Sequence, residues 1–304
     1  MPEAWPAPRR GSVVLLGLGL GWLGWLLWGA QTEVAAADNP ASALIRAGGL
    51  FPVVLFATLF SGAAAGLATS AWRPATSTSR PALARLRWPL ATGAGTVVGA
   101  LTAALVFWGY GHRTPIVLLA VSVLAAGAVG GALGAVKPGQ VVFTGLCATL
   151  ATVAAETVLS LFTPQLTGLF GAGGTAGAHL AVASRLALTA TLLGGVVAGV
   201  GAFWLLYRAR CGWRFPAYLG AGATAGILLL LADVLTRIGG TQLYGAIGRL
   251  SPADRTFVGF TAQSRLNHAL MVLFLGAIVA LLCFGSTLRW QGDSRGPQAP
   301  APGP

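Results

Sequence analysis

Hydrophobic residues gather along the chain in long runs that short polar segments separate. Eight of these runs reach the roughly 20 apolar residues that a helix needs to cross the hydrocarbon core of a bilayer. A membrane-spanning segment must satisfy its own backbone hydrogen bonds, so each run predicts a transmembrane helix. The predicted spans cover residues 12–30, 49–72, 88–109, 116–136, 141–163, 184–207, 216–236 and 267–288.

The composition agrees with this pattern. Of the 304 residues, 55% are hydrophobic and 9% are charged, whereas about a quarter of the residues in soluble domains are charged. We therefore expect an all-α integral membrane protein and exclude a soluble globular one. Residues 291–304 are rich in proline and have nothing to bury, so we expect them to form a disordered cytoplasmic tail.

The net charge of +12 indicates orientation rather than a nucleic-acid partner, because the basic residues form no stripe on a soluble face. With the N-terminus in the cytoplasm, seven of the 19 basic residues lie outside and twelve lie inside. The outer seven are Arg46, Arg113, Arg185, Arg237, Arg249, Arg255 and Arg265. This excess inside predicts that both termini are cytoplasmic. Arginine dominates over a single lysine, which suggests a GC-rich bacterial genome and hence the bacterial plasma membrane.

The first run allows a second interpretation. It follows Arg9 and Arg10 and ends before the small residues Ala35, Ala36 and Ala37, an arrangement that resembles a signal peptide with its cleavage site. The run is long for a signal peptide, and it takes part in an internal repeat. Both features favour its retention as a membrane span.

Three sequence windows of the first four spans recur in the last four. They pair residues 11–18 with 139–146 at an offset of 128, residues 57–66 with 190–199 at 133, and residues 87–99 with 214–226 at 127. The fourth and eighth spans show no convincing match. A unit of four spans begins and ends on the same side, so the windows predict a parallel duplication about an axis along the membrane normal. The units would cover residues 1–137 and 138–290, with either a pathway between them or a fused ancestral homodimer.

Glycines recur at a spacing of four residues in matched positions of the two units. This spacing puts both glycines on one helix face, where a second helix backbone can approach closely. We predict helix packing rather than substrate contact for Gly62, Gly66, Gly95, Gly99, Gly195, Gly199, Gly222 and Gly226. Gly17 with Gly21 has the same spacing.

Ionisable side chains within spans are costly and are therefore the first functional candidates. Glu156, Arg185 and Asp233 lie in the outer half of the second unit, where the offsets place Trp28 opposite Glu156 and Val106 opposite Asp233. The charges thus belong to one unit only. A substrate or ion pathway would use Glu156, Arg185, Asp233, Arg237 and His268, with His179, Arg265 and Asn267 in the flanking segments.

A structural explanation of the same charges stays open. Asp233 and Arg237 are four residues apart and can form an ion pair on one helix face. Glu156 is deep enough to need a partner, and Arg185 is the candidate for that role.

No motif assigns a chemical reaction to the chain. We find no catalytic residue set, no nucleotide-binding loop and no metal-ligand spacing, and we expect no cofactor or metal. The leading hypothesis is a transport or permease protein with Glu156 in the pathway. The second is an accessory or scaffold subunit that binds another membrane protein or a second copy of itself within the lipid bilayer. The third is a membrane enzyme that uses Asp38, Glu156 or Asp233 with His268 on a lipid-linked substrate.

Overall fold

The computed structural model describes residues 8–72, 86–110, 114–163, 165, 176–209 and 215–293. Within these ranges the chain is helical and contains no strand. Eight helices of the described residues are long and apolar enough to cross a membrane, and each overlaps a predicted span. The prediction of an all-α polytopic membrane protein is confirmed. The helices are α1 (Arg9–Ala35), α2 (Pro40–Ala71), α4 (Arg87–Tyr110), α5 (Thr114–Gly134), α6 (Gly139–Leu161), α8 (Ala176–Arg208), α9 (Phe215–Gly239), α10 (Thr241–Ile247) and α11 (Pro252–Asp293).

Two helices begin well before the predicted spans, because capped polar turns continue them beyond the apolar run. α2 starts after Asn39, whose side chain accepts a hydrogen bond of 2.7 Å from the Ser42 amide. α11 starts at Pro252, where the Ser251 hydroxyl accepts a 3.0 Å hydrogen bond from the Asp254 amide. Such caps satisfy amide groups that have no partner within the helix.

Two further helix ends differ from the predicted boundaries, the start of α8 and the end of α11. α8 begins at Ala176, eight residues before the predicted span that starts at residue 184. α11 runs to Asp293, so residues 291–293 of the segment expected to be disordered are helical, and residues 294–304 lie outside the described residues. The short helix α10 has no counterpart among the predicted spans.

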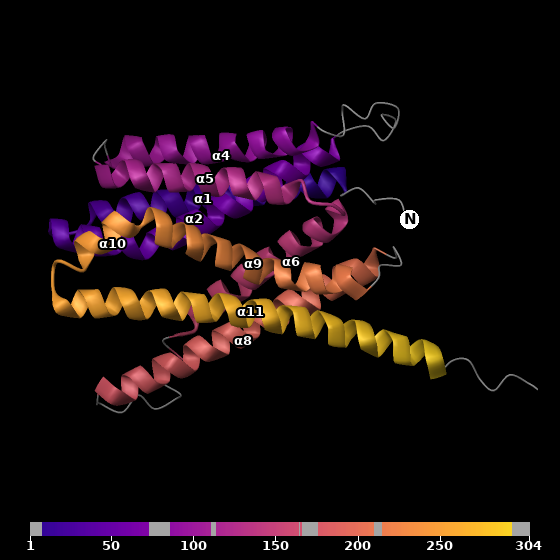
Figure 1. The fold of residues 1–304 in the computed structure, drawn as a ribbon. Helices are drawn as coiled ribbons and strands as arrows, with labels where there is room; N and C mark the ends of the chain where they lie inside the picture. The colour runs from indigo at the N-terminus through magenta and orange to yellow at the C-terminus, as the bar shows by residue number, and fades with distance from the viewer. Residues whose placement is uncertain are drawn as a thin grey trace, which may run out of the picture.

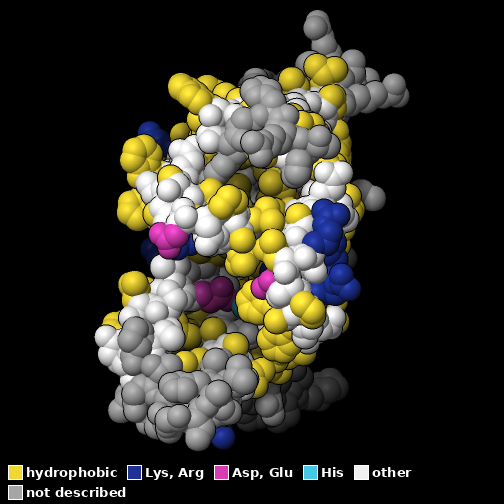
Figure 2. All heavy atoms as spheres, turned by 90° about the vertical axis from the view of Figure 1, so that its left-hand side faces the viewer, with side chains coloured by type: hydrophobic (Ala, Val, Ile, Leu, Met, Phe, Trp, Pro, Cys, Tyr) yellow, Lys and Arg dark blue, Asp and Glu magenta, His cyan; other side chains and the backbone are white. Residues whose placement is uncertain are grey.

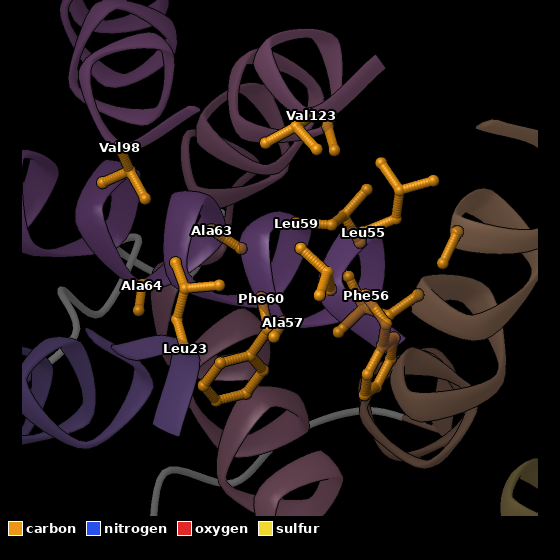
Figure 3. Packing of buried hydrophobic residues seen from close by; sticks show 14 of the residues in the cluster. Leu23, Leu55, Phe56, Ala57, Leu59, Phe60, Ala63, Ala64, Val98 and Val123 are labelled. Atoms are coloured by element: carbon orange, nitrogen blue, oxygen red, sulfur yellow. The ribbon is translucent and has the colours of Figure 1, made fainter. Parts of the chain in front are cut away.

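Helix α2 forms the centre of the core. It packs against α1, α4, α5, α6 and α9, and Figure 3 shows its side chains surrounded by those of neighbouring helices. Phe56 and Phe60 contact Trp22 of α1 edge to face, with ring centres 5.9 and 6.0 Å apart. The central position of α2 explains why its apolar side chains are buried all round.

The helices form two groups that Figure 1 shows side by side, α1, α2, α4 and α5 in one and α6, α8, α9 and α11 in the other. In the first group α2 contacts α1, α4 and α5, and α4 contacts α5. In the second group α8 contacts α6, α9 and α11, and α9 contacts α11. The second group differs from the first in one respect, because α6 also packs against α9, whereas the described residues of α1 and α4 show no comparable contact. The duplication itself stays a prediction. α1 begins and α11 ends on one side of the bundle, here called the terminal side, and the opposite side is called the far side.

The paired glycines lie where helix backbones touch. A Cβ atom on Gly62 of α2 would stand 2.5 Å from the carbonyl oxygen of Gly127 in α5, and one on Gly222 of α9 would stand 2.5 Å from that of Gly276 in α11. A side chain there would collide with backbone rather than with a movable side chain. The same collision with the backbone of a neighbouring helix is found at Gly66, Gly95, Gly99, Gly199 and Gly226, whereas a Cβ on Gly195 would meet the side chain of Leu275 in α11. Gly17 and Gly21 of α1 share the spacing but have no atom within 4 Å of a built Cβ.

We expect Gly62→Val to destabilise the bundle by about 1–3 kcal/mol, the usual cost of overpacking a well-packed core. The matched control is Gly93→Val in α4, where a built Cβ meets no atom within 4 Å. Thermal unfolding of the purified protein in detergent, followed by tryptophan fluorescence, measures the difference. Equal midpoints for the two variants would contradict the role of backbone contact at Gly62.

Candidate functional site

The ionisable residues of the second group form two clusters that α11 connects. Glu156 lies in α6, five residues before the end of that helix at Leu161, which is about 8 Å along its axis. Asp233 lies in α9. Arg265 and His268 of α11 are three residues apart and therefore on one helix face. Arg265 pairs with Asp233, and His268 pairs with Glu156.

Asp233 is buried and both of its carboxylate oxygens are paired. Arg237 Nε lies 2.7 Å from Asp233 Oδ2, and Arg265 Nε lies 3.4 Å from Oδ1. The ion pair that the spacing of Asp233 and Arg237 allows is therefore present, and Arg265 adds a second positive charge from another helix. The cluster compensates the buried carboxylate fully.

The surroundings of this cluster join four helices. Arg237 donates a 3.0 Å hydrogen bond to the carbonyl of Ala262 in α11. The Arg265 guanidinium lies 5.8 Å from the ring centre of Tyr244 in α10, and the Tyr244 hydroxyl donates a 3.0 Å hydrogen bond to the carbonyl of Gly48 in α2. Burial raises the pKa of Tyr244, so its hydroxyl stays protonated as a donor. These contacts give Asp233 a structural role.

Glu156 has a different environment. Its Oε1 atom lies 3.5 Å from His268 Nε2 and has no hydrogen-bond partner among the described residues. The side chains of Glu156 and His268 are each 28% exposed. Gly194 of α8 makes room for the carboxylate, because a Cβ there would stand 2.5 Å from Oε1. Glu156 thus faces a histidine rather than a permanently charged arginine.

Thr191 of α8 contacts the ring of His268. Its Oγ1 atom lies 2.8 Å from the carbonyl oxygen of Ala187 and 2.8 Å from the ring nitrogen Nδ1 of His268, and its one proton serves one of these two bonds at a time. In neutral histidine only one ring nitrogen carries a proton. When the hydroxyl donates to Ala187, Nδ1 carries the ring proton; when it donates to Nδ1, the ring proton is on Nε2 and faces the carboxylate of Glu156.

This pair belongs to the far-side half of the bundle. Figure 2 shows the far side, where acidic side chains lie in a hollow that has hydrophobic walls. The side chains of Glu156 and His268 are partly accessible from the surface, whereas Asp233 is buried.

The other predicted site residues do not join this cluster. Arg185 is exposed on α8 and forms no ion pair with any described side chain, so the partner of Glu156 is His268. Asn267 accepts a hydrogen bond from Gln263 on the same helix. Asp38 is exposed next to the cap of α2. The side chain of His179 lies outside the described residues.

Sequence reasoning missed Thr191 and Gly194. Threonine hydroxyls in spans usually bond to their own helix, and Thr191 also does so, so nothing in the sequence marks it as a histidine partner. Among the residues that the structure describes, no group of three metal-ligating side chains comes together.

No family model, no curated protein and no solved structure matches this chain.

We expect Asp233→Asn to lower the stability of the protein by about 2 kcal/mol, a typical value for a hydrogen bond to a charged group. Stability falls because Arg237 and Arg265 keep their positive charges after the carboxylate is removed. Arg237 is half exposed, so solvent screens its charge and limits the loss of stability. Asp38→Asn removes an exposed carboxylate and serves as the control. Thermal unfolding in detergent measures the difference. If Asp233→Asn and Asp38→Asn both had the thermal midpoint of the unchanged protein, the structural role of Asp233 would be contradicted.

Proposed function

We propose that this chain is a transport-type membrane protein in which Glu156 and His268 bind and release a proton from the far side. The observation that carries the proposal is the approach of Glu156 Oε1 to His268 Nε2 at 3.5 Å, with Nδ1 of the ring engaged by Thr191. A carboxylate and an imidazole nitrogen at this distance share a proton and release it when they separate. Proton relays of membrane transporters use such acid and histidine side chains.

The contrast with Asp233 supports a functional rather than a structural pair. A structural carboxylate at membrane depth is best compensated by a permanent positive charge, as Asp233 is by Arg237 and Arg265. Glu156 has no such partner among the described residues and instead faces a histidine, a side chain without a permanent charge. The net charge of this pair therefore follows its proton.

The contacts of the pair also give a route from protonation to movement. Glu156 lies on α6, His268 on α11 and Thr191 on α8, so the cluster joins three helices. Thr152 of α6 adds a 3.3 Å hydrogen bond to the carbonyl of Gly194 in α8. A gained or lost proton alters the attraction between α6 and α11, and a change in helix position of this kind can couple proton flow to a solute.

The proposal places both termini in the cytoplasm of a bacterial cell, so the far side faces outward. The excess of twelve basic residues over seven supports this orientation. Protons would then reach Glu156 and His268 from outside.

A second candidate function is an accessory subunit that binds another membrane protein. The feature that favours it is the lipid-facing surface of α1, where Trp25 and Trp28 are exposed. In this case Glu156 and His268 would only stabilise the fold.

The test is proton uptake into proteoliposomes that contain a pH-sensitive dye and carry a potassium diffusion potential set by valinomycin. We expect uptake above that of protein-free liposomes, and its loss in Glu156→Gln, because the amide cannot exchange a proton. Glu33→Gln at the exposed far-side end of α1 is the matched control and should keep full uptake.

Protein amount and thermal midpoint are measured for each variant. Uptake that persists in Glu156→Gln, or unchanged protein that behaves like empty liposomes, contradicts the proposal. A Glu156→Gln variant whose only defect is a lower thermal midpoint supports the accessory subunit instead.

A further inference from the structure

A groove lies on the terminal side of the bundle, between the first turn of α1 and the end of α2. Its volume is about 530 Å³, and the described residues that line it are Arg9, Arg10, Val13, Val14 and Trp72. Arg9 Nε donates a 3.1 Å hydrogen bond to the carbonyl of Ala71, the last residue of α2. This bond joins the two helices at the groove and fixes the place of the Arg9 side chain.

The groove has a charged end and an apolar end. Arg9 and Arg10 precede the predicted span that starts at residue 12, whereas the exposed side chains of Val13 and Val14 lie within it. Arg10 and Val14 are four residues apart, which is about 6 Å along the helix axis. Trp72 is exposed at the last residue of the second predicted span, and tryptophan is enriched at the membrane–water interface. The groove therefore leads from the level of the lipid headgroups into the hydrocarbon.

The charged end suits a phosphate. Guanidinium groups bind phosphate oxygens through two parallel N–H bonds, so two arginines beside one cavity favour a phosphate as their ligand. No acidic side chain belongs to the described lining of the groove or to the first turn of α1. An ammonium headgroup would thus meet two positive charges and no carboxylate there. This charge distribution favours a headgroup with a net negative charge over a zwitterionic one.

The apolar end continues along α1. Val14, Gly17 and Leu18 are three and four residues apart and share one helix face. A Cβ atom built on Gly17 would meet no atom within 4 Å, and Leu18 is exposed. An acyl chain that starts at the groove can therefore follow this face toward the bilayer centre without displacing protein atoms.

We propose that the groove binds one phospholipid with a net negative headgroup. Its phosphate lies between Arg9 and Arg10, and one acyl chain follows Val13 and Val14. The cytoplasmic leaflet carries anionic lipids, which attract basic residues next to a span, and the predicted orientation puts the terminal side in that leaflet. The lipid site is independent of the proton site, because Glu156 lies near the opposite end of its helix.

The test is native mass spectrometry of the protein in detergent, titrated separately with phosphatidylglycerol and phosphatidylcholine. We expect the first phosphatidylglycerol to bind several-fold more tightly than phosphatidylcholine. Arg10→Gln should weaken phosphatidylglycerol binding about fivefold, the effect of one basic residue beside an anionic membrane surface, and should leave phosphatidylcholine binding unchanged. Arg10→Lys should keep most of the affinity, because it keeps the charge.

The matched control for charge is Arg208→Gln. Arg208 is also exposed at the terminal side, and its guanidinium lies 5.2 Å from the ring centre of Trp204, but it does not line the groove. We expect this variant to bind phosphatidylglycerol like the unchanged protein. An equal loss in Arg208→Gln and Arg10→Gln, or equal affinity for the two lipids, would overturn the proposal, because either result indicates diffuse attraction rather than a site.

A second variant tests the groove itself. Val14→Trp fills the apolar end and keeps both arginines, so we expect it to weaken phosphatidylglycerol binding several-fold. Leu20→Trp is its control, because Leu20 is exposed on the same helix outside the groove. Full phosphatidylglycerol binding by Val14→Trp would contradict the proposed path of the acyl chain.

A soluble ligand separates a lipid from a free phosphate. Glycerol phosphate carries the same phosphate chemistry without acyl chains, so we expect it neither to bind detectably nor to displace phosphatidylglycerol. Displacement of the lipid by glycerol phosphate, with equal binding of glycerol phosphate to Val14→Trp, would overturn the lipid as the occupant and indicate a site for a soluble anion.

Discussion

Close contact of helix backbones through glycine is the constraint on which the structure depends. Apolar side chains gain little by moving from lipid to protein, so helices in a bilayer associate through tight packing. Gly62 and Gly66 let α2 touch α5, and Gly222 lets α9 touch α11. These contacts set the distances between the helix axes, and the larger side chains of α2 fill the remaining space (Figure 3).

The positions of the polar side chains follow from that packing. Gly222 and Gly226 of α9 hold α11 close at Gly276 and Leu273. His268 and Arg265 precede these contacts on α11 by one to three turns. His268 reaches Glu156 on α6, and Arg265 reaches Asp233 on α9. The same helix thus serves one carboxylate with two permanently charged partners and one whose partner carries no permanent charge. This difference in chemistry separates a structural cluster from a candidate proton site.

Much of the fold could be predicted from sequence, because an apolar run in a bilayer has to be a helix. The spacing of Asp233 and Arg237 also predicted their ion pair, since both lie on one helix. Partners on different helices could not be predicted in this way. The shared location in the outer half of the second unit suggested Arg185 for Glu156, whereas the approach of α11 supplies His268. Capped polar turns such as that at Ser251 extend helices beyond any hydropathy signal.

The central claim is that Glu156 gains and loses a proton within the membrane. Infrared difference spectroscopy of the reconstituted protein between acid and alkaline conditions tests it most directly, because a protonated carboxyl has its own carbonyl stretching band. We expect one such band to disappear in Glu156→Gln and to persist in Glu33→Gln. Identical difference spectra for the unchanged protein and Glu156→Gln would contradict the account.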